Sequence, residues 1–159
     1  MFTDDLINVF KYDAITGVIT RLVRTGNYQP NTECNSLATT GYIKVTYKGQ
    51  QFLGHRLAWF LYYKEQPPEF IDHIDLDKTN NRITNLRAAT NSQNQMNIKV
   101  HKRSKTGIKG IMPVRGGKSY RAEVCVDGVR YQKQSKNIAE LETWLLNIKP
   151  KLHGTFAAH

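Results

Sequence analysis

Residues 71–87 read IDHIDLDKTNNRITNLR, and this stretch decides the fold of the chain. It places Asp72 beside His73, continues into an asparagine-rich loop, and leads into a short strand-like segment at residues 86–89. The stretch is too polar and too particular for a routine surface loop. The pattern predicts two short strands joined by a long, ordered loop.

A helix should follow the second of these strands directly. Thr90 and Gln93 have the spacing of a capping box, in which both side chains satisfy backbone donors at a helix start. The predicted helix therefore begins at Asn91, carries Asn94, and need not extend far beyond Ile98. Together these elements predict a β-loop-β-α unit.

The residue types in this unit suit phosphodiester hydrolysis. That reaction requires a base to activate water and a hard cation to stabilise charge on the departing oxygen. Asp72 and Asn94 offer oxygen ligands that suit Mg²⁺ or Mn²⁺. His73 is the candidate base, because an unperturbed imidazole has a pKa of about 6.5 and is mostly neutral at pH 7.

These polar residues also have plainer interpretations. A lone histidine in a polar loop is commonly structural, Asn94 on an exposed helix would face solvent, and Asn85 would cap a turn. Asp75 and Asp77 suggest a calcium loop, but the glycine and closing glutamate of an EF-hand are missing, so we interpret them as solvated loop carboxylates. Neighbours on a regular strand point to opposite faces, so the Asp-His pair serves one site only if the backbone bends there.

The region upstream of the motif, residues 7–53, reads as short strands and turns. Residues 13–19 predict one hairpin, and residues 42–52 predict a second that turns at Lys48-Gly49. Between them, residues 24–40 are rich in Thr, Asn and Gly and predict a long loop.

A helix is expected between the second hairpin and the motif. It should run from His55 to Lys64, with Leu57, Phe60 and Tyr63 or Lys64 on one apolar face, and stop before Pro67-Pro68.

The C-terminal part of the chain has the pattern of a second small domain. Strands are predicted at residues 107–114, 120–126 and 129–134, with glycine turns between them. In the middle strand apolar residues alternate with Arg121, Glu123 and Cys125, so one face should be apolar and the other polar. A helix should follow, capped by Asn137 with Glu140 three residues on; its buried stripe would comprise Ile138, Leu141, Leu145 and Ile148.

Positive charge is concentrated in this C-terminal part. The chain has 23 Lys and Arg against 13 Asp and Glu, a net charge of +10. Residues 99–136 hold eleven basic and two acidic residues, so this segment carries +9 of that charge. Such asymmetry favours a polyanionic partner. An anionic membrane is the competing partner, but the segment lacks the apolar face of an interfacial helix, so nucleic acid is favoured.

Composition excludes several other classes of protein. The longest apolar run has seven residues, far below the roughly 20 that span a bilayer. The acidic N-terminus is not followed by the apolar segment of a secretory signal. Cys34 and Cys125 are too far apart for a CxxC zinc site, so we expect two buried free thiols in a reducing cytoplasm.

The motif as a whole resembles the HNH homing-endonuclease family of phages and bacteria. Asn85 lies twelve positions after His73, and Asn94 lies nine positions after Asn85. The match extends over about residues 10–98, with Asn80-Asn81-Arg82 among the agreeing residues. The resemblance implies that Asp72 and Asn94 hold one divalent metal, that His73 activates water, and that Asn85 bonds the loop backbone and so positions the histidine. The last motif position is Asn rather than His, a variant that keeps an oxygen ligand.

Three further residues near the motif are accessory candidates. His55 and Arg56 would either brace the site or contact the scissile phosphate, although packing at a helix start explains them equally well. Asn97, one helical turn beyond Asn94, completes this group.

The C-terminal pattern resembles the ethylene-response-factor (apetala-two) DNA-binding domain over about residues 105–149. In that family the outer face of the sheet enters the DNA major groove, which admits a β-ribbon. Here Gln134-Ser135 replaces the family's glycine before the helix, and Cys125 stands where an arginine is frequent. The candidate DNA-binding residues are Lys109, Arg115, Lys118, Arg121, Arg130 and Lys133.

We therefore predict an α+β protein with an HNH nuclease domain of the ββα-metal type at residues 1–98. A basic linker at residues 99–106 and an apetala-two-like domain at residues 107–159 complete it. It should hydrolyse DNA with one Mg²⁺ or Mn²⁺ per site, in the cytoplasm of a bacterium or phage-infected host. Its partner would be double-stranded DNA, with no membrane or small-molecule cofactor, and the protein would be a monomer or weak dimer. Two alternatives stay open: a non-catalytic DNA-binding protein with a degenerate nuclease motif, and a protein that binds structured RNA.

Overall fold

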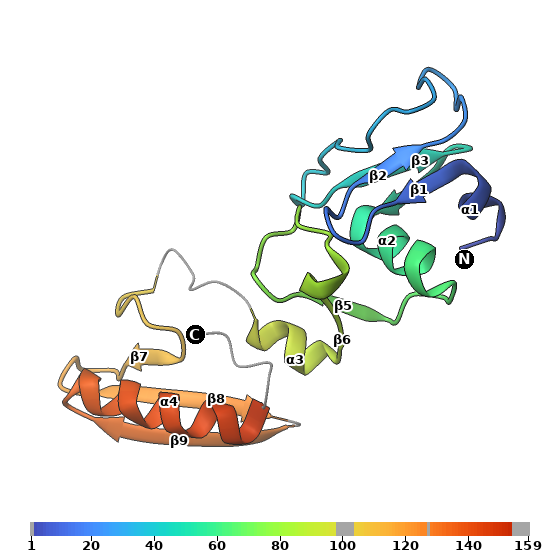
Figure 1. Ribbon diagram of the computed structural model, residues 1–159. Coiled ribbons are helices and arrows are strands. Elements are labelled where there is room, and N and C mark those ends of the chain that lie inside the picture. Colours follow the sequence, from blue (N-terminus) through green and yellow to red (C-terminus); the bar gives the residue numbers. More distant parts are fainter. Residues whose placement is uncertain (1, 98–103, 127, 154–159) are drawn as a thin grey trace. The chain divides into compact units, whose positions relative to one another are not determined.

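The computed structural model describes residues 2–97, 104–126 and 128–153 (Figure 1). The chain divides into two compact units, residues 1–90 and 91–159, and each has its own hydrophobic core. The mixture of helices and small antiparallel sheets agrees with the predicted α+β class. The predicted linker residues 99–103 lie outside the described residues.

The first unit contains three two-stranded antiparallel sheets. Both predicted hairpins are confirmed, and Lys48 and Gly49 form the second turn with φ of 47° and 77°. Positive φ at both central residues matches the twist of the flanking strands. The elements of this unit, in order, are α1 (Asp5–Val9), β1 (Phe10–Tyr12), β2 (Ile19–Arg21), β3 (Lys44–Tyr47), β4 (Gln50–Leu53), α2 (Gly54–Tyr63), β5 (Phe70–His73), a 3-10 turn (Ile83–Asn85) and β6 (Leu86–Ala89).

The core of the first unit lies between α2 and the first two hairpins. Leu57 and Phe60 are buried as predicted, together with Ala58 and Leu61. The prediction for the end of the apolar face is wrong, because Tyr63 is 44% exposed and Lys64 ends the helix in the left-handed conformation. The helix therefore ends before its apolar face gains another buried residue.

The second unit is a three-stranded sheet, in the order β7-β8-β9, with α4 across one face (Figure 1). Leu141 and Leu145 of α4 pack on Ala122 and Val124 of β8, so the predicted stripe and the predicted apolar face are confirmed. The elements are α3 (Asn91–Met96), β7 (Ile111–Pro113), β8 (Tyr120–Val126), β9 (Val129–Ser135) and α4 (Ile138–His153).

Two local predictions for this unit need correction. The first strand is much shorter than the predicted 107–114, because Gly107 and Gly110 adopt positive φ and residues 105–110 form turns and bends. Asn137 caps α4 as predicted, since its Oδ1 accepts a hydrogen bond from the Ala139 N–H at 3.0 Å. The second bond of a capping box, from the Asn137 N–H to the Glu140 side chain, is replaced. The Asn137 N–H donates instead to Ser135 Oγ, which in turn donates to Glu140.

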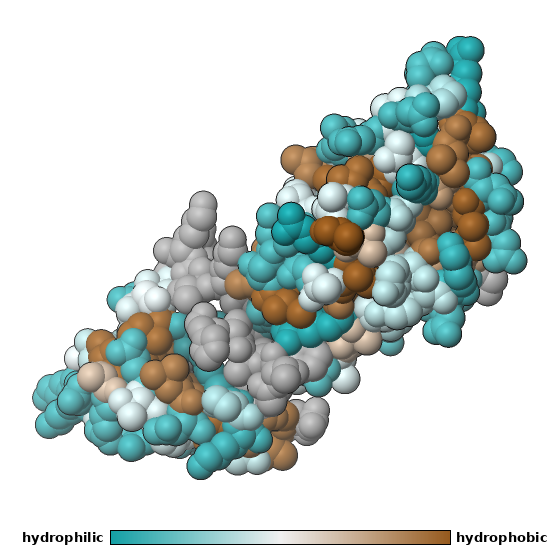
Figure 2. Space-filling view, in the orientation of Figure 1, coloured by the Kyte–Doolittle hydropathy of each residue, from teal (hydrophilic) through white to brown (hydrophobic). Residues whose placement is uncertain are grey.

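The visible surface of each unit is predominantly hydrophilic, with scattered apolar side chains (Figure 2). Among the described residues, no helix has the length and apolar character needed to cross a bilayer.

Candidate active site

Asp72 and His73 occupy the last two positions of β5, where Asp72 pairs with Arg87 and His73 with Leu86 of β6. Both side chains are buried, with relative exposures of 3% and 5%. The strand stays paired through His73, and the chain turns immediately afterwards, as the Leu76 N–H donates to the His73 carbonyl at 3.0 Å. Both side chains therefore extend from the end of β5, and each has its own contacts, which are described next.

Asp72 is held by an arginine on the neighbouring strand. Arg87 donates from Nε to Asp72 Oδ2 at 2.9 Å, and its Nη2 lies 2.7 Å from the same oxygen. A buried carboxylate is costly unless it is paired and hydrogen-bonded, so the Arg87 guanidinium offsets the cost of burying Asp72.

His73 is held by an asparagine of the following loop. Its Nε2 lies 3.2 Å from Asn81 Oδ1, a contact that suits the tautomer with the proton on Nε2, because an amide oxygen only accepts. Burial lowers the pKa of His73, although the bond to Asn81 and the charges of nearby aspartates oppose this. The imidazole is therefore neutral at pH 7, as a general base requires.

His55, at the start of α2, packs against His73. The two rings meet edge to face with centroids 5.1 Å apart, and the ring of Tyr42 lies 4.8 Å from that of His55. Burial, followed by the charges of His73 and Arg56, lowers the pKa of His55 to about 3. Its Nδ1 is buried without a hydrogen-bond partner among the described residues. The His55 ring is thus a neutral aromatic contact of His73, and its role as a brace stays a prediction.

Arg56 points away from this pair of histidines. Its guanidinium donates to the carbonyls of Pro68 at 2.9 Å and Glu69 at 3.1 Å. It thereby ties α2 to the segment that enters β5. Of the two roles considered for Arg56, these contacts fit bracing of the site rather than contact with the scissile phosphate.

Asn85 fastens the loop that follows His73. Its Nδ2 donates to Asp75 Oδ1 at 2.9 Å and to the Asn80 carbonyl at 2.8 Å, while its Oδ1 accepts from the Asp75 N–H at 3.1 Å. Asp75 and Asp77 are exposed, but they also accept hydrogen bonds from loop donors such as the Thr79 N–H, so they shape the loop rather than being solvated alone.

Asn81 is the functional candidate that the sequence reasoning missed. It is 3% exposed, and its carbonyl accepts a hydrogen bond from Tyr12 Oη at 2.8 Å. A Cβ on Gly54 would lie 2.9 Å from Asn81 Nδ2, and a Cβ on Gly17 would lie 2.7 Å from its carbonyl carbon. Two glycines therefore allow the surrounding backbone to close on Asn81. In the sequence nothing distinguished it from its neighbour Asn80.

Asn94 and Asn97 lie in the second unit. Asn94 is partly exposed on α3, which begins at Asn91 as predicted, and Asn97 is 4% exposed just after that helix. The division after Thr90 differs from the predicted domain boundary at residue 98. The pairing of Asn94 with Asp72 as metal ligands stays a prediction. The described residues contain no group of three His, Cys, Asp or Glu arranged to hold a metal ion.

Comparison with known proteins finds an HNH match in the middle of the chain. The family model described as HNH endonuclease matches residues 53–96, which include Asp72, His73, Asn85 and Asn94. The chain is 32% identical to Protein 3.8 of Escherichia phage T7 over 88 residues, which cover 55% of this chain and 73% of that protein. Residues 53–96 therefore form an HNH endonuclease domain by family match.

A second viral relative aligns over more of this chain. It is the "Uncharacterized HNH endonuclease L560" of Acanthamoeba polyphaga mimivirus, which is 31% identical over 125 residues. The alignment covers 77% of this chain and 64% of the mimivirus protein. No solved structure matches the chain significantly. The family match ends at residue 96, so the apetala-two resemblance of the C-terminal part stays a prediction.

The outer face of the C-terminal sheet gathers part of the predicted DNA-binding set. Arg121, Glu123 and Cys125 alternate with the buried residues of β8, and Arg130 lies opposite Cys125 on β9. Glu123 contacts both arginines, with Oε2 at 3.7 Å from Arg121 Nε and Oε1 at 3.4 Å from Arg130 Nε. Cys125 is exposed and Cys34 only half-buried, so the expectation of two buried thiols is wrong.

The other four predicted DNA-binding residues lie elsewhere in this unit. Arg115 and Lys118 are exposed in the turn between β7 and β8, and Lys109 is partly buried before β7. Lys133 lies opposite Ala122, on the face that α4 covers, and its Nζ pairs with Glu140 Oε1 at 2.8 Å. Lys133 is therefore not part of the outer face.

Proposed function

We propose that this protein is a metal-dependent DNA endonuclease that hydrolyses phosphodiesters to 5′-phosphate and 3′-hydroxyl ends. The observation that carries the proposal is the buried imidazole of His73, whose Nε2 lies 3.2 Å from Asn81 Oδ1 and whose pKa is lowered by burial. A base must have a fixed lone pair as well as a suitable charge. The His73 imidazole is then the group that takes the proton from the attacking water.

The residues around His73 act by positioning it. His55 supports one side of the ring, and Asn85 holds the loop that carries Asn81. Arg56 anchors α2, the helix that presents His55, to the entry of β5. Contacts from α2 and from the loop therefore hold the His73 ring in position. Such support matters because a small displacement of a catalytic group lowers the reaction rate.

Asp72 and Asn94 are the residues that we propose as metal ligands. One carboxylate and one amide oxygen suit Mg²⁺ or Mn²⁺, since Mg²⁺ keeps several waters and uses few protein ligands. When bound, the ion would stabilise negative charge on the departing 3′-oxygen. Before binding, Arg87 supplies the positive charge that accompanies Asp72.

We propose that the C-terminal unit holds duplex DNA through the outer face of its sheet and the turn before β8. Arg121 and Arg130 lie on that face and Arg115 and Lys118 on the turn, whereas Lys133 is engaged with Glu140 on the other face. Phosphate contacts by these cations would position the protein, and base-edge contacts would select the site.

The test is the incubation of supercoiled plasmid with the full chain, with and without Mg²⁺. Conversion to nicked or linear plasmid only with the metal is expected. Binding without cleavage would favour the rival interpretation, a DNA-binding protein with a degenerate nuclease motif. Competition between duplex DNA and duplex RNA at matched salt tests the other rival, and a preference for RNA would contradict a DNA substrate.

A further inference from the structure

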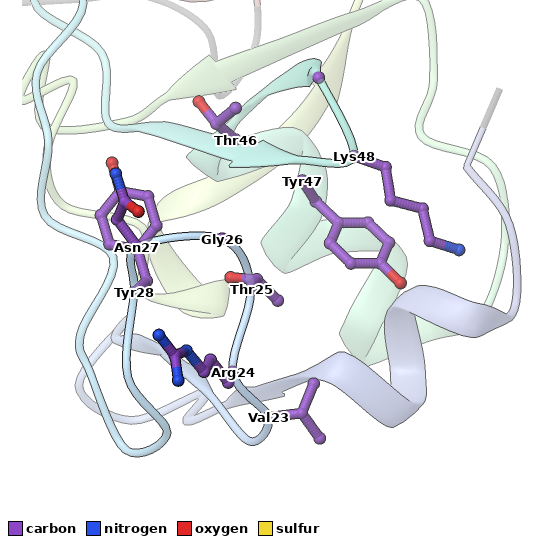
Figure 3. Close-up of a pocket in the computed structure, with 10 residues that line it drawn as sticks. Val23, Arg24, Thr25, Gly26, Asn27, Tyr28, Thr46, Tyr47 and Lys48 are labelled. Carbon is purple, nitrogen blue, oxygen red and sulfur yellow. The ribbon is translucent and has the colours of Figure 1, made fainter.

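A hollow lies in the first unit, lined by residues that precede the HNH match at residues 53–96 (Figure 3). It has a volume of about 570 Å³ and lies between two turns, residues 23–28 and residues 46–49. Arg24 and Tyr28 come from the first turn, and Tyr47 and Lys48 from the second. None of the roles assigned above uses it.

A buried arginine contacts two residues that line the hollow, although it is not a lining residue itself. Arg21 is 3% exposed, donates from Nη1 to Thr25 Oγ1 at 2.6 Å, and donates from Nη2 to the Thr46 carbonyl at 3.0 Å. Its guanidinium also lies 4.2 Å from the centroid of the Tyr28 ring. One side chain thus connects both walls of the hollow.

The charge of Arg21 is not neutralised locally. Within the described part of the chain, no carboxylate oxygen lies within 4.0 Å of its guanidinium. A buried cation without an acidic partner is costly, and salt screens a buried charge less than an exposed one. The site therefore has a standing preference for an anion.

The rim of the hollow adds further positive charge. The ten lining residues include Arg24 and Lys48 and no carboxylate. Lys48 is 71% exposed and pairs with Asp5 Oδ2 at 3.1 Å, so it is partly neutralised, whereas Arg24 makes no ion pair among the described residues. Hydroxyl groups come from Thr25, Tyr28 and Tyr47, and a hydroxyl group can donate a hydrogen bond to an anionic oxygen.

The inner wall is also well ordered. Thr25 and Tyr28 exchange both backbone hydrogen bonds at 3.1 Å, which closes residues 25–28 into a tight turn. Asn31 donates to the Arg21 carbonyl at 2.7 Å and so holds the other end of the same loop. A preformed site loses less conformational entropy on binding than a loose loop would.

We propose that this hollow binds a backbone phosphate of the DNA substrate, as a second DNA contact on the nuclease unit itself. The inference rests on the proposed function, because the phosphodiester is that of the cleaved DNA. Cations, hydroxyl donors and the absence of lining carboxylates match a phosphate oxyanion. A phosphate contact carries no sequence information, so the site would help fix the register of the nuclease unit on any duplex.

The first experiment measures duplex DNA binding by the full chain at several salt concentrations. Arg24→Gln should weaken binding uniformly across sequences and reduce the slope of log K against log salt by about 1. Lys11→Gln is the matched control, because Lys11 is an exposed cation on β1 that does not line the hollow. The double variant R24Q/K48Q should lose more. Equal slopes for Arg24→Gln, Lys11→Gln and wild type would overturn the proposal.

A second measurement needs no variant, so a folding defect does not affect it. The wild-type chain is acylated at its lysines, and modification of Lys48 is compared with that of Lys11. A short duplex should protect Lys48 several-fold and leave Lys11 unchanged. No selective protection would contradict the site. Full protection by millimolar inorganic phosphate alone would assign it to free phosphate and overturn the assignment to the DNA backbone.

Plasmid nicking, measured separately, distinguishes this inference from the proposed function. A wild-type chain that nicks DNA while Arg24→Gln binds normally would refute only the hollow. A chain that never nicks, but whose Arg24→Gln variant loses affinity and salt dependence, would refute the nuclease assignment and leave the phosphate site standing.

Discussion

Arg87 directs two nitrogens at a single oxygen of Asp72, with Nε at 2.9 Å and Nη2 at 2.7 Å from Oδ2. The two residues face each other across the β5–β6 pair, so the ion pair belongs to the hairpin itself. The carboxylate proposed as a metal ligand therefore has a built-in positive partner that holds it in place before any metal binds.

Removing that partner should destabilise the fold. Arg87→Met would leave the Asp72 carboxylate buried without its ion pair, at a cost of about 3–5 kcal/mol in the free energy of unfolding. The double variant D72N/R87M should recover much of the loss, because no unpaired charge remains. Urea denaturation of Arg87→Met, Asp72→Asn and the double variant measures the coupling between the two residues. Additive losses would show that the ion pair contributes little.

Removing the proposed base should abolish cleavage without affecting DNA binding. His73→Ala is expected to lower the single-turnover nicking rate by about 10²–10⁴-fold, the usual contribution of a general base. DNA affinity should stay within a few-fold, since the cations proposed to grip DNA lie in other elements. Cleavage at the wild-type rate would remove His73 from the mechanism.

Asn81 should matter through the orientation of His73. Asn81→Ala removes the hydrogen bond to Nε2, and a misplaced base costs about 10²-fold in rate. The loss should fall on kcat rather than on KM, because Asn81 is buried and does not reach the substrate. Asn35→Ala, at an exposed asparagine of the same unit, is the control. Equal kcat values for the two variants would contradict a positioning role.

The buried His55 predicts an acid-dependent loss of stability. Burial lowers its pKa to about 3, whereas the unfolded chain takes up the proton near pH 6.5. Between these values the unfolded state binds more protons, so the free energy of unfolding falls as pH falls, by up to about 1.4 kcal/mol per pH unit. His55→Phe should lack this part of the pH dependence. Urea denaturation of both proteins between pH 7.5 and pH 4.5 checks it; parallel curves would rule out His55 as the cause.

Glu123 should restrain DNA binding by the C-terminal sheet. It lies between Arg121 and Arg130, so Glu123→Gln frees two cations of the proposed binding face. Affinity for duplex DNA should rise about two- to fivefold, since a surface ion pair is worth up to about 1 kcal/mol. Glu142→Gln removes the same charge from exposed α4 and should have little effect. If both variants gain affinity equally, net charge rather than this face is responsible.

The local structure was largely predictable because it depends on short-range rules. The Lys48-Gly49 turn, the strand at residues 86–89 and the start of α3 at Asn91 follow from turn chemistry, alternation and capping. The errors arose where backbone conformation departs from those rules. Lys64 ends α2 in the left-handed region, and Gly107 and Gly110 break up the predicted first strand of the C-terminal sheet.

By itself, the sequence predicted the HNH match at residues 53–96 and named the candidate base and ligand residues, because motif spacing survives as a linear pattern. It also determined where positive charge accumulates. Only the tertiary structure decided the partners: Asn81 for His73, Arg87 for Asp72, and Arg21 for both walls of the hollow. Each of these contacts depends on strand register and burial, which bring together atoms whose distance along the chain carries no signal.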